Sequence, residues 1–163
     1  MNLNLIYDRT TEDVSAASSI RAKYQALRDW SGLTEAEITQ LERGMLTNVT
    51  LNRVANTVSM LASALNTAGY TVETTSQSFS ETDRLKRSKY TVYLSNVQAL
   101  RDAIAVRAST PELPAADAKL DYVGANNIEK ILADLDELLG WMTYSRKYCG
   151  TFAAGQTILP RKG

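Results

Sequence analysis

The sequence predicts an all-α protein, a bundle of four to five helices with short extended or β segments at the N-terminus, near residue 70 and in the C-terminal tail. Apolar residues recur at spacings of three and four along most of the chain, which places them on one face of a helix. Hydrophobic residues make up 44% of the 163 residues and charged residues 22%, a composition typical of folded domains. A chain of this length usually forms a single hydrophobic core. We therefore expect a single helical domain over residues 1–149, with an arm at 1–9 and a tail or second arm at 150–163.

The first third of the chain predicts an arm and two helices. Residues 2–7 turn from alternating to fully apolar, which favours a short extended segment. Thr10 or Thr11 then begins a helix with acidic residues in its first turn. A second, short helix begins at Thr34, because Glu37 three residues later completes a capping box. The residues expected to face inward are Val14, Ala17, Ile20, Tyr24, Leu27 and Trp30 in the first helix, and Ile38, Leu41 and Met45 in the second.

The clearest helix covers residues 48–70. Asn48 or Thr50 can cap its start, and Gly69 can adopt the left-handed conformation that ends a helix. A β-favouring run and a polar loop follow, and a helix resumes near Leu85 or Ser88 and stops before Thr110. The inward stripe of the helix at 48–70 is Leu51, Val54, Val58, Leu61 and Leu65.

The last helix begins near Tyr122, with Asp121 as its cap. Gly140 lies inside its apolar pattern and costs about 1 kcal/mol relative to Ala, so we expect a bend or an early end there. The tail has no helical period and forms either a short hairpin or an arm that lies on another molecule.

The residue inventory argues against common enzymes. The chain contains no histidine, which the usual serine and cysteine hydrolases and most catalytic zinc sites require. Phosphate-loop and dinucleotide-binding glycine motifs are missing as well. We predict no catalytic residue, no cofactor and no metal site. The densest carboxylates, Asp134, Asp136 and Glu137, are expected to lie on a solvated helix face, and an enzyme built on them is the least favoured class.

Charge and cysteine content define the expected environment. Lys plus Arg and Asp plus Glu number 18 each, so no net field attracts nucleic acid. Cys149 is the single cysteine, which fits folding in a reducing cytoplasm. Neither a signal sequence nor an apolar run of membrane-spanning length is present, so we expect no contact with a membrane.

Several residues are candidate assembly contacts. The basic segment at 84–89 either binds phosphate or pairs with acidic surfaces, and the neutral total favours pairing. Trp141, Tyr144 and Tyr148 share one helical face that either packs in the core or forms an exposed contact surface. The complete set is Leu5, Tyr7, Arg84, Lys86, Arg87, Trp141, Tyr144, Tyr148, Phe152 and Ile158. We also expect residues 1–9 or 150–163 to pack on an adjacent subunit.

An ordered series of segments resembles a family of small, mostly uncharacterised proteins encoded among the tail and structural genes of phages and prophages of Gram-positive bacteria. The segments are IYDRTTEDV (6–14), TLNRVANTVSMLASALNTAGY (50–70), YLSNVQALRDAI (93–104), TPELP (110–114) and ANNIEKILADLDELL (125–139). The resemblance implies a non-enzymatic virion subunit of the tail, baseplate or fibre region. Such a subunit is made in the host cytoplasm and assembles with itself and with other tail proteins. The alternative is a soluble helical adaptor or regulator that the phage encodes but does not package.

Overall fold

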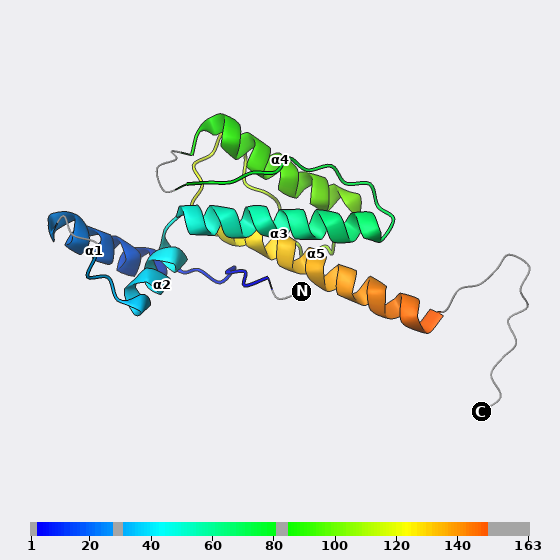
Figure 1. The fold of residues 1–163 in the computed structure, drawn as a ribbon, viewed down its shortest axis with the longest axis horizontal. Coiled ribbons are helices and arrows are strands. Elements are labelled where there is room, and N and C mark those ends of the chain that lie inside the picture. Colours follow the sequence, from blue (N-terminus) through cyan, green and yellow to red (C-terminus); the bar gives the residue numbers. More distant parts are fainter. Residues whose placement is uncertain (1–2, 28–30, 81–84, 150–163) are drawn as a thin grey trace, which may run out of the picture.

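The computed structural model describes residues 3–27, 31–80 and 85–149. The helices in these ranges are α1 (Thr11–Leu27), α2 (Glu35–Gly44), α3 (Asn48–Thr67), α4 (Arg87–Ala103) and α5 (Tyr122–Cys149). Figure 1 shows α3, α4 and α5 packed together, with α1 and α2 beside one another next to the start of α3. The predicted helical fold class is confirmed. Among the helices described, none is both long enough and apolar enough to cross a membrane.

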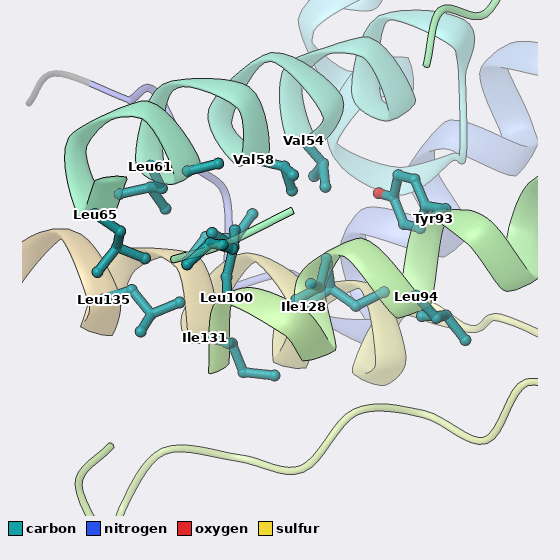
Figure 2. Close-up of a cluster of buried hydrophobic side chains, with 14 of the residues drawn as sticks. Val54, Val58, Leu61, Leu65, Tyr93, Leu94, Leu100, Ile128, Ile131 and Leu135 are labelled. Carbon is teal, nitrogen blue, oxygen red and sulfur yellow. The ribbon is translucent and has the colours of Figure 1, made fainter. Parts of the chain in front are cut away.

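One apolar core fills the space between α3, α4 and α5. Figure 2 shows side chains from the three helices pointing into a common layer. The predicted stripe of α3 is buried along its whole length, because spacings of three and four keep it on the face toward α4 and α5. Burying one large aliphatic side chain contributes about 1.5–3 kcal/mol. The largest apolar side chains that are fully enclosed are Leu61, Leu65, Leu100, Ile128, Ile131, Leu132 and Leu135.

Hydrogen bonds close both ends of α3. Thr47, rather than Asn48 or Thr50, is the N-cap, and its hydroxyl accepts from the Thr50 N–H at 3.2 Å. The expected cap was wrong because Thr and Asn, both good capping residues, follow one another there. At the other end Gly69 has a φ of 96°, as predicted. The next amide, Tyr70 N–H, donates to the Leu65 carbonyl at 3.0 Å, which completes a Schellman motif.

The hairpin of α1 and α2 has its closest approach at Gly44. A Cβ there would lie 2.2 Å from the Asp13 carbonyl oxygen and 2.5 Å from the Ala17 Cβ. Only a residue without a side chain fits. Ala17 and Tyr24 are buried as predicted, whereas Trp30 lies outside the described residues.

The capping box at the start of α2 is confirmed. Thr34 Oγ1 accepts from the Glu37 N–H at 3.2 Å, and the Thr34 N–H donates to Glu37 Oε2 at 3.0 Å. The expectation that Ile38 faces inward was wrong, since its side chain is exposed. No residue of α2 is fully buried, and the other two residues expected to face inward, Leu41 and Met45, are half-buried.

Residues 3–10 and 70–80 cross the helices without forming a strand, so the expected β segments at the N-terminus and near residue 70 are not found. The third expected segment, the tail, lies outside the described residues.

Four asparagine side chains bind these non-helical segments in place of a neighbouring strand. Each side-chain amide donates a hydrogen bond to the C=O of one residue and accepts one from the N–H of the same residue. We call these pairs the asparagine clamps: Asn52 with Phe79, Asn66 with Val72, Asn96 with Thr75, and Asn126 with Arg9.

The last helix begins as predicted. Asp121 Oδ1 accepts from the Gly124 N–H at 2.7 Å and so caps α5. The early end expected as one of two possibilities at Gly140 was wrong, because the helix continues through it to Cys149. A cost of about 1 kcal/mol for one glycine is small beside the packing of the turns before it.

Candidate functional site

The exposed end of α5 is the strongest candidate contact surface. Trp141 and Tyr144 each expose 62% of their surface, and the last core residue before them is Leu139. Figure 1 shows the final turns of α5, coloured orange, leaving the bundle. The structure thus decides between the two interpretations of these aromatic residues, in favour of exposure over core packing.

Four residues at spacings of three and four line a shallow hollow on this end of the helix: Glu137, Gly140, Trp141 and Tyr144. We call them the α5 aromatic face. The Trp141 indole N–H donates to Glu137 Oε1 at 3.3 Å, which helps to hold the ring along the helix. A Cβ on Gly140 would meet no atom within 4 Å, so nothing within the described chain requires a glycine there. The hollow is therefore a place where another backbone or side chain can approach closely.

The basic segment lies at the other end of the bundle. Lys86 and Arg87 are exposed at the start of α4, and Figure 1 shows this end of α4 far from the end of α5. The remaining candidate of this segment, Arg84, lies outside the described residues. The predicted contacts thus do not form one continuous surface.

The N-terminal arm lies on its own domain. Leu5 is half-buried and packs against the hydrophobic core. Tyr7 is exposed, with Lys130 Nζ 5.3 Å from the centre of its ring. The expectation that residues 1–9 or 150–163 pack on an adjacent subunit stays a prediction. A buried carboxylate on α5 holds residues 6–9 of the arm in their place on the domain.

That carboxylate belongs to Glu129, which is 1% exposed. Its Oε1 accepts from Arg9 Nη2 at 2.5 Å and from Arg53 Nη2 at 3.0 Å, and its Oε2 accepts from the Ile6 N–H at 2.6 Å. The Arg9 guanidinium also donates to the Ile6 carbonyl and to Asn126. Removing a charge from water is costly unless it is paired and fully hydrogen-bonded. This buried ionic cluster of Arg9, Arg53 and Glu129 therefore fixes the arm on α3 and α5.

The ionic cluster lies close to the core. Burial raises the pKa of Tyr93, and the charge of Glu129 raises it further. The Tyr93 hydroxyl thus stays protonated at physiological pH. Desolvation also raises the pKa of Tyr90.

The carboxylates of α5 hold the connection between α4 and α5. Asp134 accepts from Thr110 Oγ1 at 2.8 Å and from Lys130 Nζ at 2.6 Å. The hydrogen bond from Lys130 to Asp134, together with the charge of Asp134, raises the pKa of Lys130. Asp134 is buried, so its placement on a solvated face was wrong, because the chain around Thr110 covers it. Glu137 is exposed as expected and pairs with Arg107 at 2.7 Å.

The ionic cluster was not predicted from the sequence. A usable indication exists: Glu129 lies three residues before Leu132 and next to Ile128, both buried, so it lies beside the apolar stripe of α5. A carboxylate in that position needs cationic partners. The partners themselves are far away in sequence, and no local pattern names them.

Besides Arg84, three predicted contacts have side chains that cannot be placed. The side chains of Tyr148, Phe152 and Ile158 lie outside the described part. Within the ranges that the structure describes, no group of three or more acidic or cysteine side chains is arranged to hold a metal ion.

Comparisons with known proteins identify no relative. No family model, no curated protein and no solved structure matches the chain.

Proposed function

We propose that this protein is a non-enzymatic structural subunit of a phage virion, in the tail, baseplate or fibre-attachment region, and that it acts through contacts with copies of itself and with other tail proteins. The α5 aromatic face is the observation that carries the assembly part of the proposal. The virion part rests on the resemblance of the ordered sequence segments, which covers nearly the whole chain. The basic segment at 84–89 is a second contact surface in this proposal.

The aromatic face has the composition of an interface centre. Trp and Tyr are enriched at interfaces and account for a large share of binding energy there, because they bury much area at little entropic cost. Trp141 and Tyr144 lie on a helix end that the domain's own core does not use. A neighbouring subunit would bury both rings. Because Gly140 has no side chain, the backbone of that subunit could come close to the helix there.

The rest of the domain is suited to a fixed scaffold. The ionic cluster and the asparagine clamps attach the non-helical segments to the helices. Because these polar groups are satisfied within the chain, the domain can present its contact surfaces in one geometry. A subunit in a symmetric assembly benefits from such a geometry, since every copy must make the same contacts.

Mass spectrometry of purified particles tests the proposal. In particles of the phage that encodes the chain, we expect the protein at a fixed ratio to the major tail protein. A W141S/Y144S variant should fold normally but be lost from particles, whereas M60S, which changes an exposed apolar residue on α3, should be incorporated. Complete absence of the protein from particles would instead favour the soluble adaptor.

A further inference from the structure

A pocket lies where the α1–α2 hairpin meets the start of α5. Its volume is about 520 Å³, within the range of about 300–1,000 Å³ for small-molecule sites. The α1 residues that line it are Val14, Ser18 and Arg21, whose spacing of four and three places them on one face of that helix. Lys119 and Leu120 complete the opposite wall.

Three polar contacts hold the walls of this pocket in place. Arg43 of α2 binds Asp13 at 2.9 Å and Asp8 at 3.0 Å, which fixes α2 against the start of α1. The hydroxyls of Thr11 and Tyr122 are 3.2 Å apart, which joins α1 to the first turn of α5. The pocket therefore exists in the protein without a ligand and needs no rearrangement to form.

The four cationic side chains that line the pocket differ in whether they form ion pairs with carboxylates of the domain. Arg9 and Arg43 line it but are paired with Glu129, Asp8 and Asp13. Arg21 and Lys119 are exposed and have no ionic partner among the residues that the structure describes. Asp121 is the one carboxylate in the lining, and it already accepts from the Gly124 N–H. The lining thus carries a net positive charge that is small and local.

Most of the remaining lining is apolar, although Ser18, Thr50 and Tyr122 also contribute. Val14, Met45, Leu46 and Leu120 contribute most of it, and Leu46 is among the exposed large apolar side chains of the domain. Covering these side chains with an apolar ligand would remove their surface from water, which is favourable at about 25 cal/mol per Å². The pocket combines this apolar floor with two cations.

We propose that this pocket binds a small organic carboxylate with an apolar body, the carboxylate near Arg21 and Lys119 and the body against Leu46 and Leu120. A negative charge fits because Arg21 and Lys119 have no ionic partner in the described part of the chain, whereas Asp121 is the one carboxylate in the lining. An inorganic phosphate has no apolar body and could not use the apolar part of the lining. This inference is independent of the proposed function.

Binding of naphthalene-2-carboxylate, followed by amide chemical shifts and by calorimetry on the full chain, tests the inference. We expect shifts at Leu46, Lys119 and Ala125, which all line the pocket. The isosteric neutral probe, naphthalene-2-carboxamide, should bind about tenfold more weakly. R21Q/K119Q should weaken binding of the carboxylate about tenfold, whereas K86Q/R87Q, which removes two cations outside the pocket, should leave it unchanged.

The alternative outcomes overturn the inference. Equal affinity for the two probes would mean an apolar cavity without charge selection. Unchanged affinity in R21Q/K119Q, or shifts confined to the α5 aromatic face, would place the ligand elsewhere. Because both positions are exposed, the variants should fold, and a far-ultraviolet spectrum like that of the wild type checks this. If the carboxylate does not bind, the proposed incorporation of the protein into particles is not affected, because the two proposals rest on different surfaces.

Discussion

Asn96 of α4 binds both backbone groups of Thr75. Its Oδ1 accepts from the Thr75 N–H at 2.9 Å, and its Nδ2 donates to the Thr75 carbonyl at 2.8 Å. A side-chain amide carries the same donor and acceptor as a peptide unit, so one asparagine replaces one residue of a paired strand. With Asn52 and Asn66 making the same contacts from α3, three clamps hold residues 70–80 against the bundle without a β-sheet.

The first prediction concerns this clamp. Asn96→Ala should destabilise the domain by about 1–3 kcal/mol, because the Thr75 N–H and C=O lose their partners. Asn96 itself is buried, so water cannot take over both bonds without opening the segment. Hydrogen exchange at Thr75 should accelerate more than exchange in the core of α3. Urea denaturation gives the change in the free energy of unfolding.

Asn127 provides the matched control. It lies on α5, is half-buried, and its side chain makes no hydrogen bond with any described residue. Asn127→Ala should therefore leave both stability and exchange at Thr75 close to those of the wild type. Equal losses in the two variants would show that the clamp contributes nothing specific.

The second prediction concerns the buried carboxylate. Glu129→Gln should cost about 3–5 kcal/mol in the free energy of unfolding, because it leaves Arg9 and Arg53 without their counter-charge in a buried site. The arm should detach first. Its release would be seen as increased exchange at the Ile6 amide, which donates to Glu129 Oε2 at 2.6 Å.

Glu137→Gln is the control for this variant. Glu137 pairs with Arg107 at 2.7 Å, but both side chains are well exposed, and pairs of this kind contribute little in water. Its denaturation midpoint should stay close to that of the wild type. If both variants behaved alike, the burial of Glu129 would not be the cause of the loss.

The helices could be predicted from the sequence because their pattern is local. The stripe of α3, the capping box of α2 and the left-handed Gly69 each depend on residues within about one or two turns of each other. Cap positions were less certain, as Thr47 shows, since several neighbouring residues could fill the same role. The sequence could not decide whether Trp141 is buried or exposed. Periodicity shows which residues share a face of a helix, but it does not show how far a neighbouring helix extends along that face.

The contacts between distant segments could not be predicted. Asn126 and Arg9 are separated by 117 residues, and an asparagine inside a helix gives no sign of which backbone it will bind. The same holds for the pocket, whose walls come from α1, α2 and the start of α5. Sequence patterns indicate which side of α5 faces the core, but they do not place the arm on it.

The third prediction concerns pH. The Thr34 N–H, followed by the Tyr24 hydroxyl and the Lys23 ammonium, lowers the pKa of Glu37 from 4.5 to about 2. Because the pKa of Glu37 is lower in the folded than in the unfolded state, the ionised carboxylate stabilises the fold at pH values above its unfolded-state pKa. This stabilisation is lost as the pH falls from 4.5 toward 2. The urea midpoint of the wild type should therefore decrease over that interval.

Glu37→Gln isolates this contribution. The variant should be less stable than the wild type near neutral pH, and its midpoint should depend less on pH below about pH 4.5. Part of the slope should remain, because the pKa values of Asp13 and Glu137 are also lowered, that of Asp13 mainly by the Thr10 N–H and that of Glu137 mainly by Arg107. An identical slope in variant and wild type would contradict the prediction.

The fourth prediction compares Gly44 and Gly140, which lie in helices for different reasons. Gly44→Ala would place a Cβ 2.2 Å from the Asp13 carbonyl oxygen, so α1 and α2 must move apart and the protein should lose stability. Gly140→Ala meets no atom within 4 Å and should stabilise the isolated domain by about 0.5–1 kcal/mol, because alanine is the better helix former. Thermal unfolding measures both changes. Should Gly140→Ala raise the unfolding temperature yet reduce incorporation into particles, the glycine would serve the contact with a neighbour and not the fold of its own chain.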